Sequence, residues 1–146
     1  LPWPDMHELP GAACYCGKHG CIETWLSGTG FAAHYRLLHG ESVTAATLVE
    51  RAAHGDERAE TALQAYEERM AKSLAHVINI LDPNVIVLGG GMSNITRLYQ
   101  NVPARWGKYV FSDYVTTRLL PPRYGDSSGV RGAAWLGANH PGKNGC

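Results

Sequence analysis

Three cysteines lie within eight residues near the start of the chain, in the run Cys14-Tyr15-Cys16-Gly17-Lys18-His19-Gly20-Cys21. Thiolates this close together, with glycines that let the backbone curl, are typical ligands of a tetrahedral zinc ion. Cysteines of a disulfide framework would instead be spread along the chain. The pattern therefore predicts a structural zinc site with Cys14, Cys16 and Cys21 as three of its ligands.

The fourth zinc ligand is left open by this run, because a structural zinc site needs four. His19 lies inside the loop and would close a very tight ring, whereas His7 could reach the cluster across six residues. We favour a ligand located upstream of Leu1. A loop of reduced thiols without metal is the remaining interpretation. Cys146, the last residue, is expected to be an exposed free thiol.

A second group suited to chemistry is the run Gly89-Gly90-Gly91, which follows the apolar segment Val85-Ile86-Val87-Leu88. A strand that leads through glycines into a helix can hold phosphate groups, because glycine permits close approach and the helix N-terminus presents free N–H groups. The run matches neither of the common phosphate-loop patterns. A nucleotide loop over 85–94 and a simple strand-to-helix turn therefore both remain open.

Hydrophobic periodicity predicts the helices that must position these residues. The strongest is capped by Asp56, and its apolar side chains recur every three or four residues until Pro83 ends it. His76 on this helix is expected to be structural. Further helices are predicted over 22–39 with a break at 27–30, from a Thr44 cap to about 53, from about 95, and over 130–136.

Only two strands are predicted, over 85–88 and 115–120. The first reads as a buried parallel strand, because it is apolar throughout and β-branched. Two strands make a poor sheet and leave edges exposed. Together with a first residue that is Leu rather than Met, this indicates that part of the fold lies elsewhere. Residues 1–13 are predicted to be an extended loop, and the tail from Asn139 to be frayed.

Composition argues against several classes of protein. Thirteen Lys and Arg balance thirteen Asp and Glu, so the formal net charge is +0 and a nucleic-acid partner is not expected. No apolar run approaches the roughly 18 residues of a membrane span. The first residues have neither the basic nor the apolar region of a signal peptide. Clustered thiols without an export signal favour a cytoplasmic protein.

Three segments together resemble motifs of the ROK family of sugar kinases. The cysteine run with Ile22 and Glu23 resembles its zinc signature, 82–93 its second nucleotide motif, and 125–134 its closing segment. The resemblance covers about residues 1 to 137. Within the family, the residues of these motifs are most similar to those of bacterial fructokinases, and next to those of N-acetylglucosamine kinases.

The resemblance implies an α/β fold of the actin-like, ribonuclease H-like and hexokinase type, rich in helices with an incomplete sheet. It implies transfer of the γ-phosphate of ATP, with Mg²⁺, to a sugar hydroxyl, and a zinc ion that only stiffens a loop. Glu23 would hold sugar hydroxyls, and Gly89, Gly90 and Gly91 would lie on the nucleotide side. Without the family, the alternative for Glu23 is a first-turn acid that serves the helix dipole.

Several family motifs are absent from residues 1–146: the Glu-x-Gly-His stretch with the fourth zinc ligand, the first phosphate loop, and the Asn-Asp pair with the catalytic base. We therefore expect a partial C-terminal lobe, with a zinc knuckle at 14–23 and a nucleotide loop at 85–94. The N-terminal lobe would be absent, so the chain alone would be inactive. The whole protein is expected to be a homodimer that phosphorylates a hexose, with fructose as the expected sugar.

Other functions remain open at this point. The sugar could be N-acetylglucosamine, glucose or mannose, because one glutamate accepts hydroxyls from all of them. The same lobe could belong to a ROK-type transcriptional repressor that senses a sugar. A zinc-stapled interaction module without catalysis is the third alternative. Glu23 and the glycine loop favour the kinase, because a sensor has no need of an ATP site.

Overall fold

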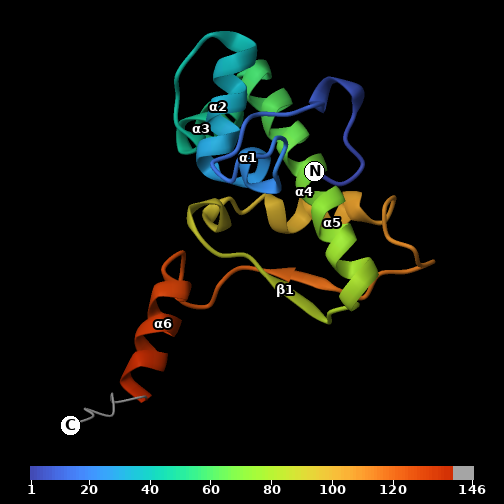
Figure 1. The fold of residues 1–146 in the computed structure, drawn as a ribbon, viewed down its shortest axis with the longest axis vertical. Helices are drawn as coiled ribbons and strands as arrows, with labels where there is room; N and C mark the ends of the chain where they lie inside the picture. The colour runs from blue at the N-terminus through green and yellow to red at the C-terminus, as the bar shows by residue number, and fades with distance from the viewer. Residues whose placement is uncertain (140–146) are drawn as a thin grey trace.

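Figure 1 shows the computed structural model of the chain, which describes residues 1–139. The expected frayed tail beyond Asn139 and the expected free thiol of Cys146 lie outside the described residues. Among the described residues, no helix is both long and apolar enough to cross a membrane. The elements in chain order are η1 (Met6–Glu8), α1 (Ile22–Leu26), α2 (Gly28–His39), α3 (Ala45–Ala53), α4 (Glu57–Leu81), β1 (Val85–Val87), η2 (Gly91–Asn94), α5 (Leu98–Trp106), β2 (Arg118–Leu120) and α6 (Ser128–Asn139).

Helix α4 is the centre of the fold and confirms the strongest sequence prediction. The Asp56 side chain accepts hydrogen bonds from the backbone N–H groups of Arg58 and Ala59, at 2.9 and 3.1 Å. These bonds satisfy two donors that every helix start leaves free. The helix packs against α3 and α5, and its apolar side chains Ala59, Leu63, Tyr66, Met70, Ala71, Ala75 and Ile78 are buried in the core.

Helices α1 and α2 are divided as predicted, with the break at Ser27. The Ser27 hydroxyl accepts the backbone N–H of Gly30 at 2.9 Å, which caps α2. A Cβ at position 30 would lie 2.5 Å from the backbone oxygen of Thr24, so only glycine lets the two helices approach this closely. The helix predicted after a Thr44 cap is also confirmed, as α3.

The sheet has two parallel strands, β1 and β2, with Ile86 opposite Leu119. Both strands are shorter than predicted. The expectation of a buried first strand is wrong for the described residues, since Val87 is 56% exposed. The cause is the lack of neighbours: in the part of the chain that is described, β1 pairs only with β2, and nothing covers its other edge.

The predicted helix after the glycine run begins later than expected. Residues Gly91–Asn94 form the 3₁₀ turn η2, and α5 begins only at Leu98. The Ser93 hydroxyl donates to the backbone oxygen of Gly90 at 2.7 Å, which holds this tight turn in place of a regular helix start. The glycines therefore lead into a 3₁₀ turn, not directly into an α-helix N-terminus.

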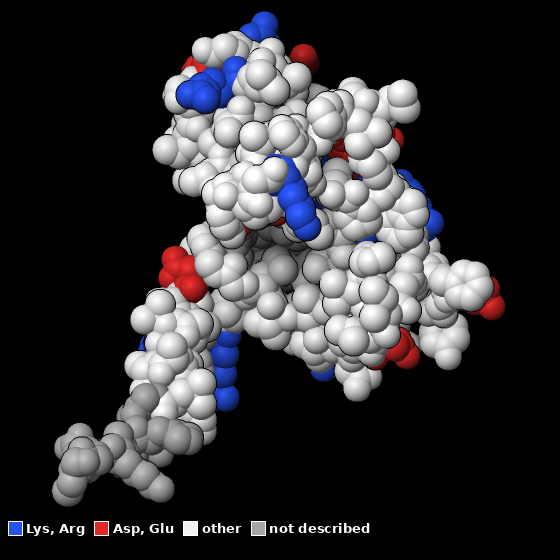
Figure 2. All heavy atoms as spheres, in the orientation of Figure 1, with Lys and Arg blue, Asp and Glu red and all other residues white. Residues whose placement is uncertain are grey.

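Helix α6 stands apart from the body of the molecule (Figure 1). Its Val130, Trp135 and Leu136 side chains are 73%, 68% and 59% exposed. On the face that Figure 2 shows, Lys and Arg side chains are scattered singly and do not form a broad positive patch. The described core lies around α4, at a distance from α6.

A buried charge network joins α4 to α5. Glu67 is fully buried, and its carboxylate accepts hydrogen bonds from Arg97 Nε at 2.6 Å, Asn101 Nδ2 at 2.9 Å and Arg105 Nη2 at 3.3 Å. Arg97 also forms a two-bond ion pair with Glu60. The Arg97 guanidinium lowers the pKa of Glu60 to about 2, so this carboxylate stays ionised at neutral pH.

The first residues of the chain are also bound to charged side chains of α4. Arg69 Nε donates to Glu8 Oε1 at 2.6 Å, and both side chains are buried. Lys72 Nζ donates to the backbone oxygen of Trp3 at 2.9 Å and pairs with Asp5 at 3.1 Å. The segment predicted as an extended loop thus lies along α4, with one short turn, η1.

We expect replacement of the buried glutamate to unfold the chain more easily than replacement of an exposed one. Glu67→Ala removes a buried carboxylate that accepts three hydrogen bonds, while Arg97 and Arg105 keep Glu60 and Glu68 as partners, so we expect a cost of about 1.5–3 kcal/mol. Glu41→Ala removes an exposed ion pair with Arg51 and should cost at most about 1 kcal/mol. Urea unfolding followed by circular dichroism measures both. Equal losses in the two variants would contradict the role assigned to Glu67.

Candidate functional site: a cysteine knuckle and two adjoining cavities

The cysteine run folds into a tight knuckle just before α1. Ala13 and His19 form an antiparallel bridge, and the backbone N–H of Cys14 donates to the oxygen of Lys18 at 2.8 Å. These bonds turn the chain back on itself, so that the sulfurs of cysteines up to seven residues apart in the sequence come together. The structure brings together the sulfurs of Cys14, Cys16 and Cys21, which all lie within 4.8 Å of one another.

The donor set fits a zinc ion. The Sγ atoms of Cys16 and Cys21 lie 3.5 Å apart. Zn–S bonds of about 2.3 Å in a tetrahedron place sulfurs about 3.8 Å apart. Hydrogen bonding to the backbone of Lys18 lowers the pKa of the Cys16 thiol, whereas the neighbouring Cys16 and Cys14 groups raise that of Cys21 to about 11. A bound cation would be needed to keep all three sulfurs deprotonated.

Neither local histidine joins the three sulfurs. Among the described residues the sulfur group contains no histidine, and His7 lies instead with Asp5 and Glu8. Glu8 is already engaged there, since it accepts from Arg69 Nε and from the backbone N–H of Asp5. The described residues therefore offer three sulfurs that could bind zinc, and His7 and His19 are not placed as a fourth ligand.

Glu23 lies in the first turn of α1, directly after the knuckle, and is exposed. It lines a cavity of about 280 Å³ between the knuckle and the start of α2, together with Cys14, Tyr15, Thr24, Ser27 and Thr29. The Glu23 carboxylate raises the pKa of the Tyr15 hydroxyl beside it. Within residues 1–136 the carboxylate forms no ion pair, and the Tyr15 hydroxyl is its hydrogen-bonding neighbour. The carboxylate is exposed and can accept further bonds from a ligand.

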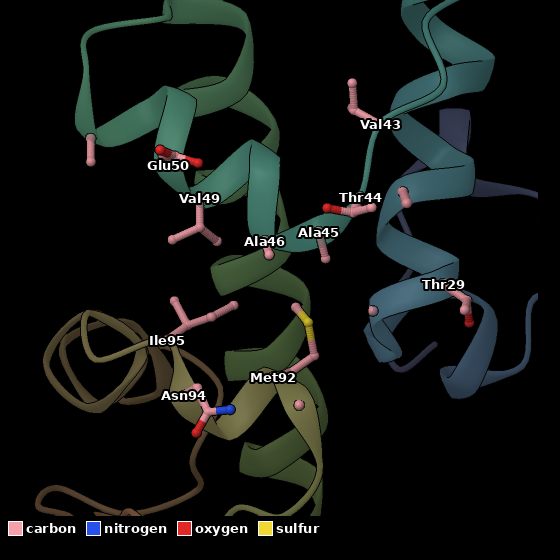
Figure 3. Close-up of a pocket in the computed structure, with 14 residues that line it drawn as sticks. Thr29, Val43, Thr44, Ala45, Ala46, Val49, Glu50, Met92, Asn94 and Ile95 are labelled. Atoms are coloured by element: carbon pink, nitrogen blue, oxygen red, sulfur yellow. The ribbon is translucent and has the colours of Figure 1, made fainter.

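A second and larger cavity, of about 840 Å³, lies where the glycine run ends. Figure 3 shows Met92 and Ile95 on one side of it, facing Ala45, Ala46 and Val49 of α3. Its walls are mostly apolar, with Thr29, Thr44, Glu50 and Asn94 as polar groups at the edges. A planar apolar group with a few polar atoms is the kind of ligand that such a cavity accepts.

The three glycines take up different positions around this cavity. Gly91 lines it, whereas Gly89 and Gly90 lead to it from β1 and are exposed. A Cβ at any of the three would meet open space, so a ligand can approach their backbone closely. The closing segment reaches the same turn, because Asn94 Nδ2 donates to Asp126 Oδ2 at 3.3 Å. The small residues Gly132, Ala133 and Ala134 lie on α6 and do not line the cavity.

The N-terminal turn of α2 forms the boundary between the two cavities, and sequence reasoning missed it. Thr29 lines both of them. Gly28 lets Met92 of the turn η2 pack closely against the start of α2, since a Cβ at position 28 would lie 3.3 Å from the Met92 sulfur. The run Ser27-Gly28-Thr29-Gly30 predicted a helix break, and its small residues were the available signal for close packing.

Comparison with known proteins finds a family match and relatives over most of the chain. The sequence model described as the ROK family matches residues 6–140. A Vibrio vulnificus (strain YJ016) protein named N-acetyl-D-glucosamine kinase is 38% identical over 129 residues, which are 88% of this chain and 43% of that protein. The chain thus spans less than half the length of this curated relative.

Solved structures give the fold. A ROK hexokinase from Thermus thermophilus superposes with a TM-score of 0.75 at 25% identity, over 93% of this chain and 45% of that one. A ROK family glucokinase from Streptomyces griseus, in complex with glucose and AMPPNP, has a TM-score of 0.73 at 22% identity, over 86% and 47%. These neighbours confirm the predicted actin-like ATPase fold, rich in helices here with a small sheet. On the match over residues 6–140, the chain belongs to the ROK family.

Proposed function

We propose that this chain is part of an ATP-dependent sugar kinase that phosphorylates N-acetyl-D-glucosamine. The sugar named for the relative at 38% identity supports this choice. The expectation of fructose is not supported by the relatives, and the alternative of N-acetylglucosamine fits them better. Glucose remains a second sugar to test, because the Streptomyces neighbour is a glucokinase.

The observation that carries the proposal is the shared boundary of the two cavities. Phosphoryl transfer between two bound substrates requires their reacting atoms to be about 3 to 3.5 Å apart. The cavity with Glu23 and the cavity at the glycine run both contain Thr29 in their walls. A sugar in one and a nucleotide in the other would therefore meet at the first turn of α2.

On the nucleotide side, the larger cavity would take the adenine base of ATP. Its apolar walls, Val49 and Ile95 among them, suit a planar ring, and Thr44 and Asn94 can form hydrogen bonds with ring nitrogens. Gly89, Gly90 and Gly91 would border the ribose and phosphates, because their open backbone permits close contact. ATP would enter with Mg²⁺, which neutralises charge on the phosphate oxygens.

On the sugar side, Glu23 would accept hydrogen bonds from two neighbouring hydroxyl groups. A carboxylate has two oxygens for this purpose, and bonds to a charged acceptor are stronger than neutral ones. Cys14, Cys16 and Cys21 would hold a structural zinc ion directly before α1. The metal would fix the loop that precedes Glu23, and the carboxylate would then be held in one position for the sugar.

The catalytic base would come from outside residues 1–146. In this proposal the chain forms a partial C-terminal lobe, with the knuckle at 14–23 and the nucleotide loop at 85–94. A further lobe would supply the base and the remaining strands of the sheet. We propose a homodimer in the cytoplasm, where reduced thiols can bind zinc.

A panel of sugars tests the proposed reaction on the full-length polypeptide. We expect ADP release that depends on N-acetyl-D-glucosamine and is faster than with fructose, glucose or mannose. Glu23→Gln should lower kcat/KM for the sugar by about tenfold or more, because the charged acceptor is lost. Glu57→Gln, an exposed acid at the start of α4, is the matched control. Activity with fructose alone, or sequence-specific DNA binding without ADP release, would refute the proposal.

A bulky side chain in the larger cavity tests the nucleotide assignment. Ala46→Phe places a ring among the apolar walls, and its own site on α3 is exposed, so the core stays intact. The KM for ATP should rise by about tenfold or more while the KM for the sugar stays the same. Ala104→Phe, on an exposed position of α5, is the control. A change in the sugar KM alone would place the nucleotide elsewhere.

Zinc content tests the knuckle independently of activity. The purified polypeptide should hold about one zinc ion, and cobalt substitution should give thiolate-to-cobalt absorption. Cys16→Ser should reduce this absorption, because one of three thiolates is lost, and should weaken metal binding by more than the roughly 10–100-fold that the loss of a group outside the ligand set costs. Cys146→Ser replaces the one cysteine outside the cluster and should change nothing. Equal metal binding by Cys16→Ser and the parent protein would exclude Cys16 as a ligand.

A further inference from the structure

Two sulfurs of the cysteine knuckle lie close enough together for a second kind of chemistry, which needs no metal. Cys16 Sγ and Cys21 Sγ are 3.5 Å apart, and both residues are free thiols in the structure. A disulfide bond is about 2.05 Å long, so the two sulfurs would have to approach by about 1.5 Å. This is a small movement for two side chains that are not buried.

Backbone hydrogen bonds hold the knuckle closed without help from the sulfurs. The N–H of Gly17 donates to the oxygen of Cys14 at 3.0 Å, and the N–H of Gly20 donates to the oxygen of Ala12 at 2.9 Å. Gly17 and Gly20 have φ angles of +82° and +64°, a region that favours glycine, and both lie between the two cysteines of the pair. The fold of the loop thus brings the two sulfurs together, and a bond between them would not have to close the loop.

Of the three cysteines, Cys16 and Cys21 are the pair best placed to react. Their sulfurs are in contact, whereas the Cys14 sulfur is known only to lie within 4.8 Å of both. Cys16 is exposed, and the other two are half-buried. An oxidant that arrives from solvent would therefore meet Cys16 first, with the Cys21 thiol beside it. An accessible cysteine next to a second thiol is the usual arrangement of a redox-sensitive pair.

We propose that Cys16 and Cys21 form a reversible disulfide when the knuckle holds no metal, with hydrogen peroxide as the oxidant. The peroxide transfers one oxygen atom to the Cys16 sulfur, which gives a sulfenic acid and releases water. The Cys21 sulfur then attacks the Cys16 sulfur, the S–O bond breaks, and the S–S bond forms with loss of a second water. The two thiols together lose two electrons and two protons, and the peroxide is reduced to water. A dithiol reductant reverses the reaction by thiol–disulfide exchange.

The disulfide and the proposed zinc ion exclude each other, because both use the sulfurs of Cys16 and Cys21. A metal binds the thiolate, which a sulfur in a disulfide no longer provides. Cys14 alone would then remain of the three sulfurs, and a structural zinc site needs four ligands. The knuckle therefore has two alternative cross-links directly before α1. The inference goes beyond the proposed kinase reaction, since neither the sugar nor ATP takes part.

Lys18 lies between the two cysteines in the sequence, which gives a direct test. The full-length polypeptide is freed of metal, treated with hydrogen peroxide, alkylated at its remaining thiols, unfolded and digested with trypsin. Cleavage after Lys18 separates Cys16 from Cys21, so the disulfide joins the peptide that ends at Lys18 to the peptide 19–36. Mass spectrometry should find this joined pair, with the alkyl group on Cys14. Dithiothreitol added before alkylation should abolish the pair.

Variants and metal identify the reacting thiols. Cys16→Ser should lower the yield of the joined pair by about tenfold or more, because the exposed thiol is lost. Cys14→Ser, the matched control, removes the third thiol and should leave the yield unchanged. The zinc-loaded polypeptide should form the pair more slowly by about tenfold or more, because the metal occupies both sulfurs.

Four results would overturn the proposal. They are the absence of a joined pair, a bond from Cys14 to Cys21 in the parent protein, an undiminished yield in Cys16→Ser, and equal rates with and without zinc. ADP release is not measured in any of these experiments. Failure of the proposed kinase reaction would therefore leave their results unchanged, and the two proposals can fail separately.

Discussion

The fold depends on three charged side chains of α4 that are buried away from water. Glu67, Arg69 and Lys72 each need an opposite charge or a polar group beside them, because a buried charge without a partner is costly. For Glu67 the partners come from α5, and for Arg69 the partner is Glu8, 61 residues earlier. Loss of either contact would leave a buried charge without compensation. The charges therefore specify which segments lie on α4 more strictly than apolar packing would.

The contacts to α4 also position the two cavities. The segment that carries Glu8 leads directly into the cysteine knuckle, and α5 follows directly on the turn after the glycine run. Between them, the Tyr66 hydroxyl of α4 donates to the backbone oxygen of Leu26 at 2.8 Å, which fixes the end of α1. One rigid helix thus sets the positions of the knuckle, of Glu23 and of the turn at Met92. A shift of any of these elements along α4 would change the distance between the cavities.

Features that depend on residues close together in the sequence could be predicted, whereas features that depend on residues far apart in the sequence could not. The convergence of the cysteines was predictable, because all three lie in one short loop. The extent of α4 was also predictable from its apolar period, but the same period gives no reason to expect Glu67 or Lys72 in the core. The walls of the larger cavity could not be found, since Ala46 and Ile95 are brought together only by tertiary packing. The expected burial of β1 was wrong because it assumed neighbouring strands that the described residues lack.

The first turn of α2 links the packing of the chain to its proposed chemistry. Gly30 is required because a Cβ would meet the backbone of Thr24 at 2.5 Å, and at Gly28 a Cβ would press on Met92 at 3.3 Å. A side chain at position 30 would push α1 away from α2, and one at position 28 would displace the Met92 side chain. Both changes would alter the wall at Thr29 that the two cavities share. Since phosphoryl transfer tolerates little separation of the reacting atoms, the close packing that stabilises this turn would also be a condition for the proposed transfer across it.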